Sequence, residues 1–146
     1  MKIAIGSDHR GLELKARVIK LVTEAGHEYY DFGAYSEASV DYPNIAEVVG
    51  KAVASGKYEF GILICGTGIG MCIAANKVKG IRAALATTEL MACRSRQHNN
   101  ANILCLGAEN DQSQLAQMVK AFLTCQFEGG RHQPRVDEMT KMENER

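Results

Sequence analysis

Short apolar runs alternate along this chain with longer segments in which apolar residues recur every three or four positions. Runs of the first kind, such as FGILIC at 60–65, are typical of strands buried on both faces of a parallel sheet. In the second kind, Leu14, Val18 and Leu21 fall on one face of a helix. The pattern predicts strands at 2–6, 28–33, 60–65, 81–86 and 102–107, and helices at 11–25, about 45–56, about 69–78, 88–97, about 115–123 and about 136–144.

Five successive strand–helix units imply a parallel sheet with right-handed crossovers and helices on both faces. We therefore predict an α/β fold: a single doubly wound, Rossmann-like domain over residues 1–146, with a five-stranded parallel sheet and an extra C-terminal helix. Asp111 and Gln114 have the spacing of a capping box for the fifth helix. In open sheets of this class, ligands bind beyond the carboxyl ends of the strands.

Composition and charge exclude several classes of function. Of the 146 residues, 46% are hydrophobic and 23% are charged, and 17 basic residues balance 17 acidic ones. This balance gives no nucleic-acid-binding surface and no polybasic patch for a membrane. No apolar run has the length of a transmembrane helix, and the apolar stretch that opens the chain is too short for a signal peptide. We expect a cytoplasmic protein.

The cysteines and histidines predict neither a disulfide framework nor a metal site. The five cysteines are odd in number and none form a C-x-x-C pair, so we expect free thiols. Four of them fall inside predicted helices or strands and are assigned to packing: Cys72, Cys93, Cys105 and Cys125. The four histidines have no metal-ligand spacing with the cysteines or with each other: His9, His27, His98 and His132.

The loop ICGTGIG follows the third predicted strand and is the main candidate for chemistry. Its spacing G-x-G-x-G differs from the dinucleotide fingerprint G-x-G-x-x-G, which weakens a dinucleotide-binding interpretation. Glu89 lies about twenty residues downstream, as that fingerprint requires of an acidic residue, so the interpretation is not eliminated. A tight turn without a ligand is another interpretation. Cys65 directly precedes a helix start, where N–H groups and the helix dipole stabilise anions, so it is either a reactive thiolate or a small packing residue.

Charged residues elsewhere offer further candidates. Asp8 and His9 follow the first strand, where Asp8 is either functional or a cap for the next helix. Arg131 and Arg135 flank Pro134 and either grip a phosphate together or belong to a solvated tail. His98 ends a helix of about ten residues, which carries it about 15 Å toward the opposite edge of the sheet. If His98 serves the same site as Cys65, a second subunit must supply it, which predicts an obligate oligomer.

Six segments together resemble the ribose-5-phosphate isomerase B family, which also contains the galactose-6-phosphate isomerase subunits. They run end to end in the family's order: IAIGSDHRG, SVDYP, GILICGTGIGMCIAANK, GIRAAL, SRQHNNANILCLG and EGGRHQPRV. The resemblance implies a reversible aldose–ketose isomerisation between ribose 5-phosphate and ribulose 5-phosphate, a step of the non-oxidative pentose phosphate pathway. It also implies that no metal or organic cofactor takes part.

The resemblance assigns the chemistry of the loop. Cys65 is implied as the general base that moves a proton between C2 and C1 through a cis-enediolate, and Thr67 as a residue that positions the substrate oxygens. The backbone N–H groups of the loop are implied to hold the negative enediolate. That loop comprises Gly66, Thr67, Gly68, Ile69 and Gly70.

The resemblance also assigns residues far from the loop. His98 is implied to open the furanose ring with help from Asp8, and Asn99 to assist at the enediolate. Tyr42 is implied to line the pocket. The phosphate is implied to be held by His9, Arg131 and Arg135. These residues come from two subunits of a homodimer with shared active sites, and pairing of dimers into a tetramer stays open.

Two positions depart from the family pattern. Glu109 stands where many members have an arginine that contacts phosphate, and Arg10 is a candidate to replace the missing charge. Asn100 stands where the family's H-N-D segment ends in aspartate. Two alternatives therefore remain: an isomerase of a six-carbon sugar phosphate, such as allose or galactose 6-phosphate, and a non-catalytic sugar-phosphate-binding module. In the second case, alkylation of Cys65 should be slow and insensitive to sugar phosphate.

Overall fold

The strands form one parallel sheet in the order β2-β1-β3-β5-β4, in a computed structural model that describes all residues 1–146. The strands are β1 (Lys2–Ser7), β2 (Glu28–Asp31), β3 (Phe60–Cys65), β4 (Ala83–Leu85) and β5 (Ile103–Gly107). The helices are α1 (Leu12–Glu24), α2 (Tyr42–Ala54), α3 (Ile69–Ala75), α4 (Glu89–Asn99), α5 (Leu115–Thr124) and α6 (Gln133–Asn144). The predicted five-stranded parallel α/β architecture is confirmed.

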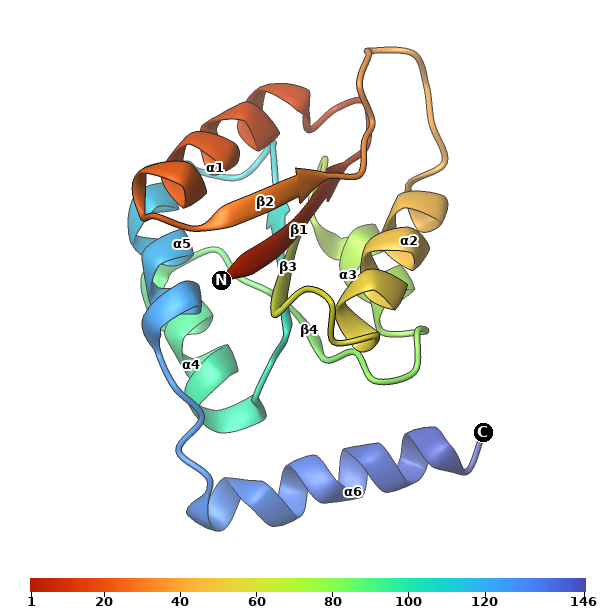
Figure 1. Cartoon of the computed structure of the whole chain (residues 1–146), viewed down its shortest axis with the longest axis vertical. Coiled ribbons are helices and arrows are strands. Elements are labelled where there is room, and N and C mark those ends of the chain that lie inside the picture. The colour runs from red at the N-terminus through yellow and green to blue at the C-terminus, as the bar shows by residue number, and fades with distance from the viewer.

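Helices cover the sheet on both faces, α1, α4 and α5 on one and α2 and α3 on the other (Figure 1). The alternation of strand side chains explains this arrangement. In β3, Ile62 and Ile64 pack into the core with α1 and α5, whereas Leu63 and Cys65 pack into the core with α2 and α3. Cys65 therefore faces the α2–α3 layer at the last position of its strand.

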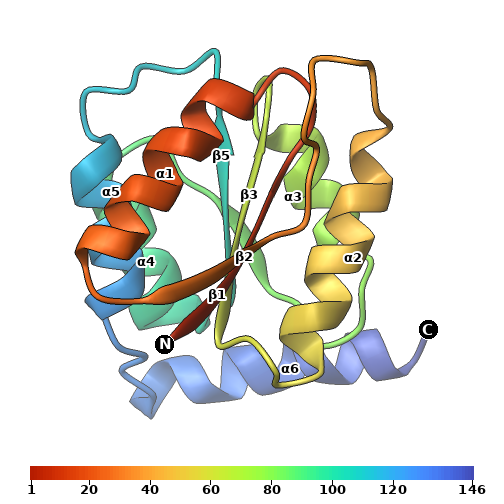
Figure 2. The same cartoon turned by 45° about the horizontal axis from the view of Figure 1, so that its top comes forward.

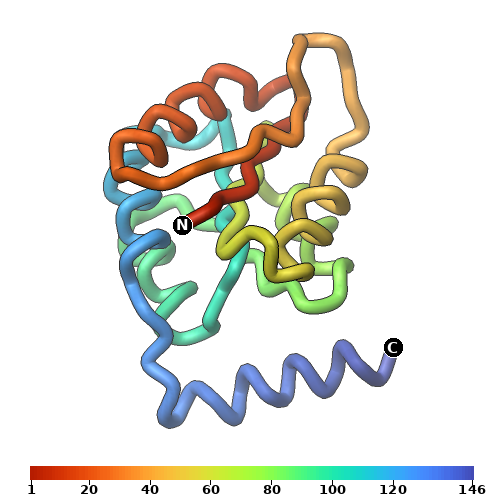
Figure 3. The backbone as a smooth tube through the Cα atoms, in the orientation of Figure 1, coloured from red at the N-terminus to blue at the C-terminus, as the bar shows by residue number.

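The two edges of the sheet carry different parts of the chain. The carboxyl ends of β1, β3 and β5 meet at one edge, where Cys65 pairs with Gly107 and Ser7 pairs with Ile64. Helix α6 runs along the opposite, amino edge, below the other helices (Figures 2 and 3). The N–H of Gly80 donates to Glu143 Oε1 at 2.9 Å and ties α6 to the body there. None of the helices is both long and apolar enough to span a membrane.

Several predicted boundaries and caps need correction. The strands β2 and β4 are shorter than predicted, and α6 begins at Gln133 because Pro134 fits the first turn of a helix. The predicted capping box is wrong. Asp111 accepts hydrogen bonds from the N–H and hydroxyl of Ser113, while the side chain of Gln114 accepts from the N–H of Glu89. Gln114 therefore links the starts of α4 and α5.

The expectation that all five cysteines are free is also wrong. Cys93 of α4 and Cys125, directly after α5, form a disulfide with their Cα atoms 5.5 Å apart. The two helices pack side by side on one face of the sheet, so residues 32 positions apart in the chain meet. Cys65, Cys72 and Cys105 remain free thiols.

Candidate functional site

A cavity of about 670 Å³ opens at the carboxyl edge of the sheet. It lies between the loop after β1, the loop after β3 and the start of α2. Eight of the predicted site residues line it: Asp8, His9, Tyr42, Cys65, Gly66, Thr67, Ile69 and Gly70. The remaining lining residues are Arg10, Ser39, Val40, Ile73 and Glu109. Of these, the sequence singles out only Arg10 and Glu109, as departures from the family pattern near the phosphate.

Cys65 sits at the floor of this cavity with 5% of its surface exposed. Its Sγ accepts a hydrogen bond from the Gly68 N–H at 3.2 Å, which fixes the sulfur against the loop. The N–H of Ile69 donates to Thr67 Oγ1 at 3.2 Å. The N–H groups of Gly66, Thr67 and Gly70 have no acceptor within the protein. The loop thus places a thiol beside three backbone donors that are free to bind an anion.

Two of the loop glycines are required by geometry. Gly68 has φ +82°, and a Cβ there would lie 2.6 Å from Leu85 Cδ1 and 2.9 Å from the carbonyl carbon of Leu106. Gly70 leaves room for the ring of Tyr42, whose Cζ would lie 2.6 Å from a Cβ at that position. The glycines therefore let the loop turn over the end of β5 and bring an aromatic wall close to the backbone donors.

The loop after β1 is held by the side chain of Asp8, which is buried. Its Oδ1 accepts from the N–H groups of Arg10 at 2.9 Å and Gly11 at 3.2 Å, so Asp8 stabilises a turn before α1 and does not cap the helix itself. His9 Nδ1 accepts from the Val40 N–H at 3.3 Å. That bond assigns the proton to Nε2 and makes His9 a donor toward a ligand.

The fixed charges of the cavity are unfavourable for a dianion. Arg10 brings the one guanidinium, while Asp8 and Glu109 bring two carboxylates. Arg10 and Glu109 both approach Gly66: a Cβ there would lie 2.8 Å from Glu109 Oε2 and 3.4 Å from Arg10 Nη1. One copy of the chain therefore offers backbone donors and His9 to a phosphate but no excess of positive charge.

Five predicted site residues do not line this cavity: Gly68 of the loop after β3, and His98, Asn99, Arg131 and Arg135 from later in the chain. His98 and Asn99 are the last residues of α4, which runs from the carboxyl edge toward the amino edge over 11 residues (Figure 2). Asn100, with φ +49°, ends the helix in the left-handed conformation. The structure thus separates His98 from Cys65 within one chain, as the helix length predicts.

His98 meets two residues that sequence reasoning missed. Its ring stacks on that of His132, with centroids 4.3 Å apart and planes 15° apart. Glu128 Oε1 lies 4.0 Å from His98 Nε2 and 3.6 Å from His132 Nε2. Glu128 and His132 are four positions apart in the chain. His98 lies far from both in sequence and meets them only because the segment after α5 runs alongside the last turns of α4. The sequence gives no signal for this meeting.

The electrostatics of this cluster oppose a cation. Its ligand atoms lie within 4.8 Å of one another, which is close enough for a metal ion. However, Arg131 Nε lies 3.5 Å from His132 Nε2 and puts a fixed positive charge at a ligand atom. Burial, and then the neighbouring His98 and Arg131, lower the pKa of His132 below its usual value. We therefore interpret the cluster as two stacked imidazoles beside a carboxylate, and not as a metal site.

A second thiol has an altered acidity. The hydrogen bond with Cys105 lowers the pKa of Cys72 to about 7, against the opposing effect of burial. The same bond, together with complete burial, raises the pKa of Cys105. Cys72 is half-buried and lies outside the cavity that Cys65 lines. We therefore expect Cys72 to carry more thiolate at neutral pH than an ordinary cysteine, in addition to its packing role.

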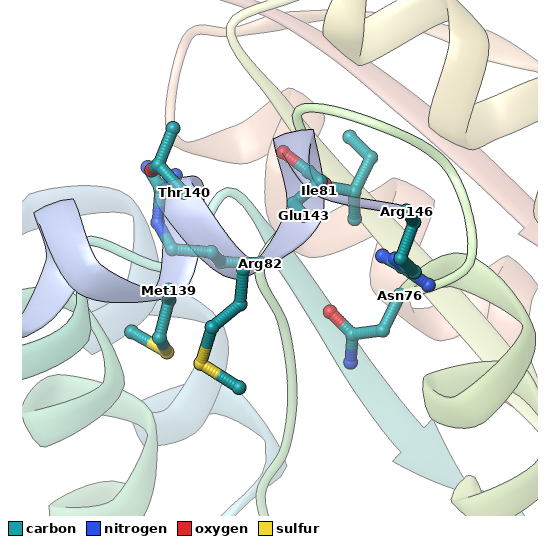
Figure 4. A pocket seen from close by; sticks show the side chains of 8 residues that line it. Asn76, Ile81, Arg82, Met139, Thr140, Glu143 and Arg146 are labelled. Atoms are coloured by element: carbon teal, nitrogen blue, oxygen red, sulfur yellow. The ribbon is translucent and has the colours of Figure 1, made fainter.

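Another cavity, of about 430 Å³, lies at the amino edge between α6 and residues 76–82 (Figure 4). Met139, Thr140 and Glu143 approach it from α6, and Asn76 and Arg82 approach it from the body. No predicted site residue lines it, and it contains no thiol or imidazole. The candidate site therefore stays at the carboxyl edge.

Comparison with known proteins places this arrangement among sugar isomerases. A family model described as ribose/galactose isomerase matches residues 3–139. A ribose-5-phosphate isomerase B of Escherichia coli is 47% identical over 146 residues, covering 99% of this chain and 98% of that one. A ribose-5-phosphate isomerase B structure from Clostridium thermocellum superposes with a TM-score of 0.96 at 46% identity, covering 99% of both chains. One from Mycoplasma genitalium, with bound ribulose-5-phosphate, gives a TM-score of 0.94 at 44% identity and covers 99% of this chain and 97% of that chain.

Proposed function

The chain belongs to the ribose/galactose isomerase family, and from that premise we propose that it interconverts ribose 5-phosphate and ribulose 5-phosphate. The observation that carries the proposal is the loop after β3. There the Cys65 thiol lies in a sugar-sized cavity beside three unpaired backbone N–H groups. An aldose–ketose isomerase needs these two elements, a base and an anion-stabilising set of donors.

In this mechanism the Cys65 thiolate takes the proton from C2 of the open-chain aldose. The electron pair of that C–H bond forms the C1=C2 double bond, and the carbonyl oxygen becomes an enediolate oxygen. The N–H groups of Gly66, Thr67 and Gly70 bind the developing charge, with Thr67 also offering its hydroxyl. The Cys65 thiol then gives a proton to C1 while the C2 hydroxyl proton moves to the first oxygen, which leaves the ketose.

The phosphate requires positive charge that one copy of the cavity lacks. Arg131 and Arg135 carry such charge, and they belong to the segment at the amino edge together with His98. We infer that a second copy of the chain brings these three residues to the cavity, with Asn99 beside them. Each charge-assisted hydrogen bond to phosphate contributes about 1.5–3 kcal/mol, and this binding energy holds the reacting carbons in place.

Exposed apolar side chains at the rim of the cavity support a homodimer. Tyr42, Ile69 and Ile73 are 38%, 51% and 58% exposed, and all three line the opening. Ile69 and Ile73 lie one turn apart on α3 and face the same way. Such a patch beside a site that lacks cations is suited to a second copy that brings them.

Glu109 supports a second candidate substrate, a six-carbon sugar phosphate. Its carboxylate lines the cavity and accepts hydrogen bonds from hydroxyl groups while it repels phosphate. A longer sugar would place an additional hydroxyl within the cavity. Ribose 5-phosphate remains the first candidate because the relatives reported above are ribose-5-phosphate isomerases.

The proposal is tested by measuring ketose formation from ribose 5-phosphate with the purified protein and with Cys65→Ala. We expect turnover in the wild type and a loss of about 10²–10⁴-fold in the variant, the usual contribution of a general base. Cys105→Ala, which removes a thiol outside the cavity, is the matched control. Wild-type turnover that survives in Cys65→Ala would reject the thiolate base. Turnover of allose 6-phosphate or galactose 6-phosphate, with no turnover of ribose 5-phosphate, would show that the substrate is a six-carbon sugar phosphate.

A further inference from the structure

Three side chains from different parts of the chain meet at the amino edge of the sheet. His98 ends α4, Glu128 lies in the segment after α5, and His132 immediately precedes α6. The exposed fractions of their side chains differ: 8% for His132, 32% for His98 and 48% for Glu128. The partly exposed ring of His98 therefore stacks on the buried ring of His132.

The backbone around this cluster is fixed at two further points. The N–H of Glu128 donates to the carbonyl of Gln97 at 3.0 Å, directly beside His98. The disulfide between Cys93 and Cys125 joins α4 to the same segment one turn earlier. These links hold residues 125–132 along the last turns of α4. The stacking of His98 on His132 thus depends on ordered backbone on both sides.

We propose that Glu128 and His132 are positioning residues for His98, a role that rests on the proposed function of His98 in opening the sugar ring. Glu128 Oε1 faces Nε2 of both imidazoles. A carboxylate on that side favours the proton on Nε2 of His98, which leaves Nδ1 as the proton acceptor. The stacked ring of His132 fixes the plane in which Nδ1 points.

This arrangement serves the opening of the sugar ring, a step in which protons and electron pairs move only within the sugar and His98. Nδ1 takes the proton of the O1 hydroxyl, and the O1–H electron pair becomes the C1=O1 bond. The C1–O4 bond breaks, its electron pair goes to O4, and the proton on Nδ1 is passed to O4. The imidazole ends as it began, and the sugar is open. The efficiency of this relay depends on the direction of Nδ1, which Glu128 and His132 set.

Ribulose 5-phosphate separates this step from the proton transfer at carbon. Its carbonyl is at C2, and the C5 hydroxyl that would close a five-membered ring carries the phosphate, so the ketose is always open. Exchange of its C1 hydrogen with D2O then requires Cys65 and the enediolate donors but no ring opening. Turnover of ribose 5-phosphate requires both steps. The ratio of the two rates therefore reports on His98 and its neighbours.

The experiment measures both rates in Glu128→Gln, His132→Ala and His132→Phe, with Glu138→Gln on the exposed face of α6 as the matched control. We expect kcat for ribose 5-phosphate to fall about tenfold in Glu128→Gln, a part of what acid–base catalysis contributes. We expect a fall of about 3–10-fold in His132→Ala and a return toward wild type in His132→Phe, which keeps a flat ring. KM and the C1 exchange rate should stay within about twofold of wild type.

Each other outcome overturns a defined statement. If exchange and turnover fall together, the two residues support the fold or the carbon chemistry and are not positioning residues for ring opening. If neither rate changes, the cluster has no role in the reaction. If the wild type exchanges nothing and turns over nothing, the proposed function itself fails. Thermal unfolding of each variant separates loss of fold from loss of position.

Discussion

The two edges of the sheet use different parts of the polypeptide to build chemistry. At the carboxyl edge the groups are a thiol and backbone N–H donors, placed by a loop whose glycines permit close approach. At the amino edge they are imidazole, carboxylate and guanidinium groups on helix ends and on the segment after α5. In the proposed function, the first edge stabilises the enediolate and the second binds phosphate and moves a proton on oxygen. Neither edge is a complete site.

The difference between the edges also concerns how they are held. The loop after β3 is fixed by the sheet itself, since the N–H groups of Ala108 and Glu109 donate to the carbonyls of Cys65 and Gly66 at 2.8 Å. The segment after α5 has no sheet to pair with and is held by the disulfide and by Glu128. Changes that affect only one edge are therefore possible, and they test whether the two are independent.

The largest expected effect on stability is loss of the disulfide at the amino edge. In the chain-entropy model, a link across 32 residues stabilises the fold by about 3–4 kcal/mol. We expect the double variant Cys93→Ala, Cys125→Ala to lose about that much free energy of unfolding in urea, relative to the oxidised wild type. The reduced wild type is the control and should approach the variant. Equal stability of oxidised and reduced wild type would contradict the prediction.

The next effect concerns binding by the amino edge. Replacing Arg131 or Arg135 by Gln should raise KM for ribose 5-phosphate by about 10–100-fold, because each removes one charge-assisted hydrogen bond to phosphate. Steady-state kinetics measure the change, and Arg17→Gln on α1 is a control with the same loss of charge. An unchanged KM in both variants would mean that the phosphate is held elsewhere.

A smaller effect is expected from a charge reversal at the carboxyl edge. Glu109→Arg removes a carboxylate from the cavity and adds a guanidinium. We expect KM for ribose 5-phosphate to fall by about 3–10-fold, with kcat little changed. Glu145→Arg, near the end of the chain and away from the cavity, makes the same charge change as a control. A rise in KM would indicate that Glu109 binds a sugar hydroxyl that the reaction needs.

The smallest expected effect concerns the rate at which thiols are alkylated, and it distinguishes Cys72 from Cys65. With its pKa lowered to about 7 by the Cys105 hydrogen bond, Cys72 should be alkylated by iodoacetamide at a rate that rises with pH and is half-maximal near pH 7. Sugar phosphate should protect Cys65, which lines the cavity, and leave Cys72 unprotected. Peptide mass analysis separates the two sites, with Cys72→Ser as the control. Protection of both thiols would place Cys72 at the ligand.

The sequence predicts the carboxyl edge well and the amino edge poorly. The run FGILIC gives β3 with its true bounds, and the glycine loop follows it directly, so Cys65 and its donors are contiguous in the chain. Such local patterns survive folding because the strand period and the turn chemistry both act over a few residues. The length of α4 likewise predicts that His98 leaves the carboxyl edge.

The errors arise where packing brings distant residues together. Cys93 and Cys125 have no motif spacing, and their pairing follows from the contact of α4 with α5. Gln114 fits a local capping box, yet its side chain accepts from Glu89, 25 positions away. Tertiary contacts of this kind override local preference, and one sequence without its fold does not contain their signal.

The central claim is that Cys65 and His98 of different copies form one site. Its most direct test mixes two inactive chains, Cys65→Ala and His98→Asn, after unfolding and joint refolding. With random pairing, half of the dimers are mixed and each has one intact site, so about a quarter of wild-type turnover should return. Mixing without refolding is the control for exchange between dimers. No recovery, with mixed dimers present by native mass spectrometry, would contradict a site shared between copies.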